Sequence, residues 1–366
     1  MSNEEKVVVN DKKTTENETD CSRKKEHIAN KLSKETKSTM VVRIITAIIL
    51  AIVVVPTFFF GGWSFLVTIL IALLISIHEF LHVAKVKKGF WFVYVFVYIM
   101  TISLTFWIFI KNNMNENLYG ESHPPFHPLD FTKWNFWHGF ENIEISTFGV
   151  ITILIFVFIS VILVPDFDFY LGSYIFIMMI IVGIGFQSLL FLRFLPQNMA
   201  NSEDAFIVGF TSEGIVSSFL LLYVIIGTTF NDIGAYFVGV LFGRRKLIER
   251  ISPKKTIEGF IGGIVISFVF SFAFAMICSL TGNEILAFLS HKEWYWLVLL
   301  SLLMPLLGNL GDLFFSALKR NFEIKDYGTF LRGHGGILDR LDSILVVSLV
   351  VSLLIVFIRN SWSFLL

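Results

Sequence analysis

Charged residues are scarce in this chain, and cysteines are scarcer still. Only 16% of the residues are charged, whereas 55% are hydrophobic and 16% aromatic, and the mean hydropathy is +0.73. A composition this apolar excludes most soluble folds and predicts a protein that crosses a membrane several times. One of the two cysteines, Cys21, lies in a polar stretch and the other, Cys278, in an apolar run, so neither a disulfide framework nor a cysteine-based zinc site is indicated.

Net charge is also lacking, because 29 Lys and Arg residues balance 29 Asp and Glu residues. Charge balance therefore gives no argument for a nucleic-acid partner. Aliphatic residues are sparse in residues 1–40, which are rich in Lys, Glu, Asn, Thr and Ser. Such a segment cannot bury enough apolar area to offset its ordering entropy, so we expect a disordered, cytosolic, hydrophilic tail. It lacks the features of a signal peptide, and the first apolar run, from about Val41, is expected to be a retained anchor.

Long apolar runs fill the rest of the chain. A membrane span needs about 20 apolar residues. On this measure nine spans are expected, at about 42–60, 62–83, 90–110, 145–164, 169–192, 206–230, 257–281, 294–318 and 337–358. The sequence thus predicts an all-α polytopic membrane protein with one transmembrane domain at 41–360, whose catalytic half lies at about 206–358. The stretch Asn231–Gly243 is too short to cross alone, which predicts a broken or re-entrant element lining a cavity.

Orientation follows from the short loops that are rich in Lys and Arg. Basic residues gather in the tail and in the loops 85–88, 244–255 and 319–332, whereas the loop 111–144 also carries several acidic residues. Because basic loops stay on the cytosolic side, the tail and the loops 244–255 and 319–332 are predicted to share that side.

The most informative stretch is 316–342, where charge is dense between two apolar spans. Charge beside a membrane is costly unless it is functional. Basic side chains suit a polyphosphate, glycines let backbone N–H groups approach oxygens closely, and aspartates are hard ligands for a divalent cation. The stretch contains Lys319, Arg320, Lys325, Arg332, Gly333, His334, Gly335, Gly336, Asp339 and Asp342. It predicts a metal–phosphate site at the bilayer surface.

Two earlier segments carry further polar signals. Asp232 places a carboxylate at apolar depth, which favours a functional role, although a polar residue hydrogen-bonded between helices is the alternative. Ser252 and Pro253 resemble an N-cap and the first position of a helix, where Lys254 and Lys255 would meet a bound phosphate. A plain cytosolic anchor is the alternative for the lysine pair.

These motifs stand in the order known from phosphatidate cytidylyltransferases, also called CDP-diacylglycerol synthases, and the chain resembles that family from about residue 42 to 358. The matching residues are Ser316, Lys319-Arg320, Lys325-Asp326, His334-Gly335-Gly336 and Asp339-Arg340-Leu341-Asp342, together with Asn231-Asp232, Gly234-Ala235-Tyr236, Ser252-Pro253-Lys254-Lys255-Thr256 and Glu258-Gly259. One position departs, since Arg332 stands where the family usually has Pro or Gly. That departure concerns the rigidity of the loop rather than its chemistry.

The resemblance implies that the phosphate of phosphatidic acid attacks the α-phosphate of CTP, with Mg²⁺ as cofactor and a second cation as a further candidate. It implies that Asp312 and Asp339 bind the metal, and Asp342, one helical turn beyond Asp339, is a third ligand or a supporting group. The expected catalytic residues are Asp312, Lys325, Asp326, His334, Asp339 and Asp342. The expected phosphate-binding residues are Asp232, Ser252, Lys254, Lys255, Ser316, Lys319, Arg320, Gly335, Gly336 and Arg340.

The expected partners are CTP, phosphatidic acid and the lipid bilayer, with a second copy of the chain as a candidate and no nucleic acid. The expected location is the endoplasmic reticulum membrane, with the active site facing the cytosol, and the mitochondrial inner membrane and the bacterial plasma membrane are the alternatives. Two other functions stay open. His78-Glu79-Phe-Leu-His82 fits the H-E-x-x-H pattern of an intramembrane zinc metalloprotease, although no segment supplies a third ligand. A CTP-dependent polyisoprenoid kinase is chemically close and differs in its acceptor, which is an alcohol.

Overall fold

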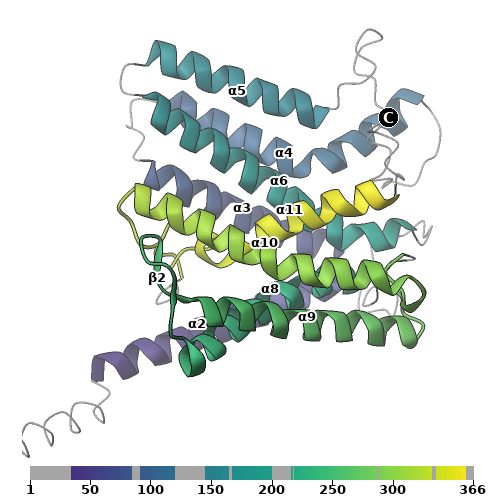
Figure 1. Cartoon of the computed structure of the whole chain (residues 1–366). Helices are drawn as coiled ribbons and strands as arrows, with labels where there is room; N and C mark the ends of the chain where they lie inside the picture. The colour runs from purple at the N-terminus through teal and green to yellow at the C-terminus, as the bar shows by residue number, and fades with distance from the viewer. Residues whose placement is uncertain are drawn as a thin grey trace, which may run out of the picture. The chain divides into compact units, whose positions relative to one another are not determined.

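The computed structural model describes residues 34–84, 91–119, 145–164, 167–199, 216, 218–286, 288–331 and 335–359. These residues form nine α-helices, one short 3-10 helix and one two-stranded sheet (Figure 1). The predicted all-α class is therefore confirmed. Most of the predicted tail, residues 1–33, lies outside the described residues, and the first described helix already begins at Lys34.

The first five described helices match the first five predicted spans. They are α2 (Lys34–Phe60), α3 (Gly62–Val83), α4 (Trp91–Tyr119), α5 (Ile145–Leu163) and α6 (Phe169–Met199). The described residues from Ile52 onward make up one compact unit, and the part of α2 before Ile52 belongs to another. At the end of α2, the fully buried guanidinium of Arg193 donates hydrogen bonds to the carbonyls of Phe58 (2.9 Å) and Phe59 (3.3 Å). These carbonyls have no partner within the helix, so Arg193 satisfies them.

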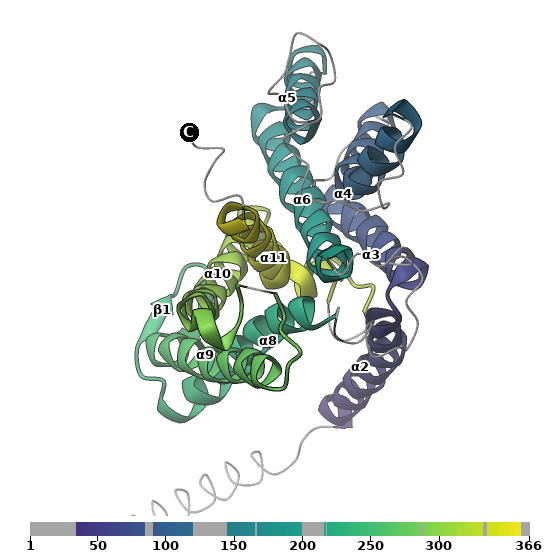
Figure 2. The ribbon, with the colours of Figure 1, turned by 90° about the vertical axis from the view of Figure 1, so that its right-hand side faces the viewer.

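The remaining elements belong to the predicted catalytic half of the chain. They are α8 (Phe219–Phe242), β1 (Lys246–Ile248), β2 (Ser252–Thr256), α9 (Ile257–Leu280), a 3-10 turn (His291–Glu293), α10 (Trp294–Asn321) and α11 (Leu338–Arg359). β1 and β2 form an antiparallel hairpin, with Lys246 opposite Thr256, that connects α8 to α9. α8 and α9 lie side by side, and α10 packs against α8, α9 and α11 (Figure 2).

Small residues let α8 and α9 approach each other closely. A Cβ on Gly259 would lie 2.6 Å from the carbonyl oxygen of Ala235, and one on Gly263 would lie 2.7 Å from that of Asn231. Ser267 on α9 also donates a hydrogen bond of 2.5 Å to the carbonyl of Gly227 on α8. Close backbone packing and hydrogen bonds between helices are the main attractions available in a bilayer, so this pair forms a tight unit.

The expected broken or re-entrant element at Asn231–Gly243 is wrong, because α8 runs without interruption from Phe219 to Phe242. The helix begins later than the predicted span 206–230, and its 24 residues are long enough to cross a bilayer unaided. Asn231 needs no break in the helix, since its side-chain oxygen accepts a hydrogen bond of 2.9 Å from Asn309 on α10.

The helix start expected at Ser252–Pro253 is also wrong, because both residues lie in β2. The N-cap of α9 is Thr256, whose hydroxyl accepts a hydrogen bond of 3.2 Å from the backbone N–H of Gly259. Glu258 in the first turn accepts the N–H groups of Arg244 and Arg245, which ties the start of the hairpin to α9. The lysine pair therefore sits on a strand rather than in a first helical turn.

Five of the described helical segments are long and apolar enough to cross a membrane: Gly62–Val83, Phe169–Phe194, Phe219–Phe242, Ile257–Leu280 and His291–Asn321. Shorter apolar helices lie at Ile48–Phe60, Trp91–Phe106 and Gly149–Leu163. Their lipid-facing surfaces carry many exposed aliphatic and aromatic side chains. The protein is accordingly an integral membrane protein.

Candidate active site

The hairpin and the end of α10 meet at one end of the helical bundle. Arg320 donates hydrogen bonds to the carbonyls of Ile251 in the hairpin (3.4 Å) and Ile324 beyond α10 (3.2 Å). The segments 244–255 and 319–331 therefore lie together, while their predicted place on the cytosolic side stays a prediction. Arg320, which was predicted to bind phosphate, joins these two pieces of backbone in the structure.

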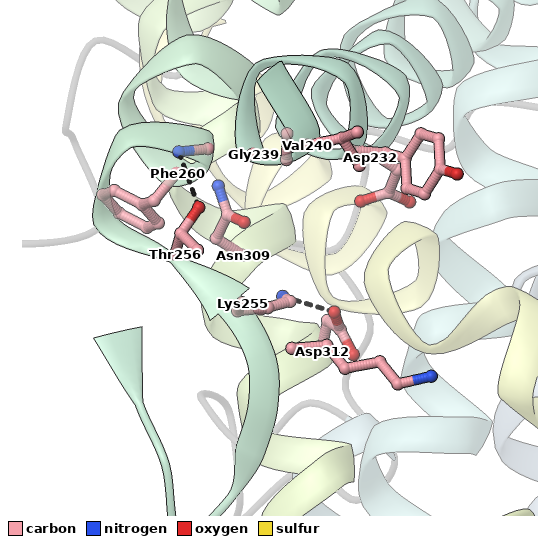
Figure 3. Close-up of a pocket in the computed structure, with 12 residues that line it drawn as sticks. Asp232, Gly239, Val240, Lys255, Thr256, Phe260, Asn309 and Asp312 are labelled. Atoms are coloured by element: carbon pink, nitrogen blue, oxygen red, sulfur yellow. Dashed lines mark hydrogen bonds and ion pairs between the residues drawn. The ribbon is translucent and has the colours of Figure 1, made fainter. Parts of the chain in front are cut away.

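A cavity of about 410 Å³ lies between α8, β2, α9 and α10. Its lining consists of Asp232, Ala235, Tyr236, Gly239, Val240, Lys254, Lys255, Thr256, Gly259, Phe260, Asn309 and Asp312. Figure 3 shows Lys255 reaching from β2 to Asp312 on α10, where the ammonium and the carboxylate form an ion pair. Acidic and basic groups thus share a cavity that also has an apolar wall.

Two carboxylates, Asp232 of α8 and Asp312 of α10, line this cavity. Asp342 of α11 lies near enough to both to interact with them electrostatically. Gly311 permits this approach, since a Cβ there would lie 3.0 Å from Val346 and 3.3 Å from the carbonyl oxygen of Asp342. Sequence reasoning grouped Asp232 with the phosphate-binding residues, whereas the structure places it in an acidic group. Such a group needs cations to balance its charge.

Asp339 lies in the first turn of α11 and has protein partners on both carboxylate oxygens. Its Oδ1 accepts a hydrogen bond of 2.9 Å from Nζ of Lys319, and both side chains are largely buried. Its Oδ2 accepts the backbone N–H groups of Tyr327 (2.8 Å) and Gly336 (3.0 Å). Asp339 therefore fastens the loop after α10 to the start of α11, and the N–H of Gly336 already has an acceptor within the protein.

Tyr327 belongs to this arrangement but was not singled out from the sequence. Its ring centroid lies 5.6 Å from Nζ of Lys319, within the range of a cation–π contact. Burial raises the pKa of the Tyr327 phenol, and Tyr174, Asp339 and Asp342 raise it further, so the ring stays neutral. Its place directly after Lys325-Asp326 was the one signal that the sequence offered.

The other predicted site residues occupy varied positions. Ser316 donates a hydrogen bond of 3.3 Å to Asp312, one helical turn before it. Lys325, Asp326 and Arg340 are exposed. Asp326 lies beside Gly335, and Arg340 acts electrostatically on Asp232. Ser252 and Lys254 lie in the hairpin, and Lys254 lines the cavity. His334 lies outside the described residues, as does Arg332.

The donor set fits Mg²⁺. Among the described residues, no three His, Cys, Asp or Glu side chains converge as a ready metal-binding group. Mg²⁺ is usually held by one or two carboxylates together with water and substrate phosphates, not by an all-protein cage. Asp312 on the cavity wall, with Asp342 and Asp232 beside it, offers hard oxygen donors of this kind.

The H-E-x-x-H pattern does not form a catalytic arrangement. His78 and His82 are exposed on α3, with ring centroids 6.3 Å apart. Glu79 is buried, and its two carboxylate oxygens accept backbone N–H groups at the start of α11. A glutamate used in this way has no oxygen directed at a zinc-bound water, so the geometry gives the protease hypothesis no support.

Comparison with known proteins identifies the family of the chain. A phosphatidate cytidylyltransferase of Bacillus subtilis is 37% identical over 209 residues, which cover 57% of this chain and 66% of the relative. Proteins of the same name from Staphylococcus haemolyticus and Staphylococcus epidermidis are 40% and 39% identical over 37% and 40% of this chain, and these matches span about half of each relative (48% and 51%). A family model described as "Cytidylyltransferase family" matches residues 41–358. The chain therefore belongs to the cytidylyltransferase family.

Proposed function

We propose that this protein transfers CMP from CTP to phosphatidic acid and releases pyrophosphate, so that it makes CDP-diacylglycerol. The observation that carries the proposal is the cavity lined by Lys254, Lys255, Asp232 and Asp312, in which Lys255 and Asp312 form an ion pair. Two polyanions that react with each other require both basic side chains and cation ligands at one place. The names of the relatives support this substrate pair.

In the proposed reaction, an oxygen of the lipid phosphate forms a bond to the α-phosphorus of CTP. The bond between that phosphorus and the oxygen bridging to the β-phosphate breaks, and the electron pair leaves with pyrophosphate. No protein nucleophile is needed, so the protein's task is to position the groups and balance their charge. Lys254 and Lys255 are placed to bind phosphate oxygens, and Lys255 would exchange Asp312 for a substrate phosphate.

The acidic residues would hold the metal. Asp312 and Asp342 are proposed ligands, with Asp232 beside them on α8. Asp339 is the third proposed ligand, and its Oδ1 would exchange the ammonium of Lys319 for the metal. Mg²⁺ bound there would neutralise the charge of the substrate phosphates and of the departing pyrophosphate. Lys319 holds Asp339 in place from α10, through the hydrogen bond of 2.9 Å.

The apolar wall of the cavity supports a lipid acceptor. Tyr236 and Val240 of α8, both exposed, line the cavity together with Phe260 of α9. Figure 3 labels Val240 and Phe260. Polar substrates alone would not need this surface, whereas the glycerol end and acyl chains of a phospholipid would bury apolar area against it.

The bacterial relatives bear on which membrane holds the protein. They give no support to the endoplasmic reticulum and favour a plasma membrane, which we propose together with a cytosolic active site. A cytosolic site would give CTP direct access. The homodimer expected as a candidate partner stays a prediction.

Single cysteines should locate the site relative to the membrane. In a background without Cys21 and Cys278, cysteine at Glu249 in the hairpin or Phe330 in the later loop is expected to react with an impermeant thiol reagent from the cytosolic side only. Cysteine at Lys292, at the opposite ends of α9 and α10, should react from the other side. Labelling of positions 249 and 330 from opposite sides would contradict a single cytosolic site.

An acceptor comparison tests the proposed function. Detergent-solubilised protein supplied with CTP, phosphatidic acid and Mg²⁺ is expected to release pyrophosphate in step with a CMP-linked lipid. Dolichol in place of phosphatidic acid should give no product, which separates this activity from a polyisoprenoid kinase. A rate with dolichol that equals or exceeds the rate with phosphatidic acid would reverse the assignment.

A further inference from the structure

Glu79 makes a long-range contact that the reaction scheme does not use. It lies on α3, is 4% exposed, and its Oε1 accepts the backbone N–H of Ile337 at 2.9 Å. Its Oε2 accepts the N–H of Leu338, also at 2.9 Å. These donors lie 258 and 259 residues along the chain, at the start of α11. The first N–H groups of a helix have no partner within it, so Glu79 caps α11 from another helix.

Two glycines leave the space that this carboxylate occupies. A Cβ on Gly328 would lie 2.5 Å from Oε1 of Glu79, and a Cβ on Gly336 would lie 2.5 Å from Oε2. Neither glycine has a positive φ angle. The need for glycine at these positions therefore arises from the close approach of Glu79, not from the backbone conformation.

Glu79 and Asp339 together bind four neighbouring backbone donors. Asp339 accepts the N–H groups of Tyr327 and Gly336, and Glu79 accepts those of Ile337 and Leu338. Three consecutive N–H groups at the entry to α11 thus end on carboxylates. These hydrogen bonds fix the position and the orientation of the first turn of α11. That turn carries Asp339, and Asp342 follows one turn later.

We propose that Glu79 is a positioning residue, which holds the first turn of α11 and thereby keeps Asp342, in the next turn, beside Asp312. The inference rests on the proposed function and adds to it a residue that touches no substrate. A carboxylate is required because both donors are N–H groups, and the side chain must reach α11 between Gly328 and Gly336. The same contact explains why an acidic residue is tolerated inside an apolar helix.

The first test replaces Glu79 with Gln, which keeps the size and turns one acceptor into an NH₂ donor facing an N–H. We expect kcat to fall at least about tenfold, because small displacements of reacting groups are costly. KM for CTP should stay within about twofold, since the phosphate-binding lysines are untouched. His82→Ala, an exposed neighbour on α3, is the matched control and should retain the wild-type rate.

A second test uses the space between the glycines. Gly328→Ala should lower kcat in the wild-type background, because its methyl group pushes on Glu79. In a Glu79→Ala background the same substitution should cost almost nothing further, since the carboxylate it meets is gone. If Gly328→Ala lowers kcat by the same factor in the Glu79→Ala background as in the wild type, the proposal is overturned. If Glu79→Gln does not fold, Gly328→Ala, which keeps the carboxylate, carries the test by itself, and a wild-type kcat in that variant overturns the proposal.

The third test does not depend on activity. Hydrogen–deuterium exchange of the peptide around residues 335–342 should be slow in the wild type and in His82→Ala, and faster in Glu79→Gln, while peptides of α9 stay unchanged. Unchanged exchange in Glu79→Gln overturns the inference whatever the assay shows. Faster exchange with unchanged kcat in a wild type that makes CDP-diacylglycerol also overturns it. If the wild type makes no such lipid, the proposed function fails, and the exchange experiment still decides whether Glu79 holds α11.

Discussion

Asp339→Asn is expected to lower the rate of cytidylyl transfer by at least about 10²-fold, which corresponds to about 2.7 kcal/mol of lost transition-state stabilisation. The substitution keeps the size of the side chain but removes its charge. Lys319 then keeps a buried ammonium group without its anionic partner, and an amide NH₂ comes to face either Lys319 or the N–H groups of Tyr327 and Gly336. Loss of one partner from a buried charged pair is strongly destabilising, so the site should also loosen.

The measurement is kcat at saturating CTP and phosphatidic acid, with thermal unfolding recorded on the same samples. Asp168→Asn is the matched control, because Asp168 also accepts a backbone N–H, that of Leu171 at 2.8 Å, yet is exposed and lies outside the site. It should keep the wild-type rate. Near-normal turnover by folded Asp339→Asn would remove Asp339 from the catalytic set.

Asp312→Asn is expected to lose a similar factor, about 10²-fold or more, with little change in stability. Asp312 and Lys255 retain 28% and 25% of their side-chain exposure, and ion pairs in such settings contribute only about 0–1 kcal/mol to folding. The loss should therefore appear in kcat and not in the unfolding temperature. If Asp312 had a mainly structural role, Asp312→Asn would lower the unfolding temperature and leave kcat nearly unchanged.

Lys255→Ala distinguishes phosphate binding from metal binding. Because Lys255 is proposed to bind phosphate, its removal should raise KM for CTP or for the lipid along with any fall in kcat. Lys292→Ala, at the far end of α10, is the charge-matched control and should change neither constant. A Lys255→Ala enzyme with wild-type KM for both substrates would contradict the role of the β2 lysines.

The approximate positions of the described helices could be predicted from the sequence because the length of an apolar run is a local property. The predicted span 62–83 and helix α3 have the same bounds, and 145–164 differs from α5 by one residue. The error at α8 came from the start of the span. Because a span was placed at 206–230, Asn231–Gly243 remained as a piece too short to cross, whereas the helix begins at Phe219 and includes it. The polar Asn231 inside this helix has its partner, Asn309, on α10.

The same limit applies to the site. Lys255 and Asp312 could be named from motifs, but their pairing requires the hairpin to fold onto the end of α10. Glu79 shows the limit most clearly. Its neighbours His78 and His82 form a local pattern with a known chemical meaning, while its partners Ile337 and Leu338 lie at the other end of the chain. The local spacing of these three residues suggested a zinc site, whereas the packing of the folded chain directs Glu79 to the start of α11.

The most direct test of the central claim follows the phosphates of CTP. Purified protein in detergent with Mg²⁺ and phosphatidic acid is given CTP labelled either at the α-phosphate or at the γ-phosphate, and the lipid is extracted. Cytidylyl transfer predicts that the α-label enters the lipid in equal amount to the pyrophosphate released, and that the γ-label stays in the aqueous phase. Transfer of the γ-label to lipid, or pyrophosphate release without α-labelled lipid, would contradict the account.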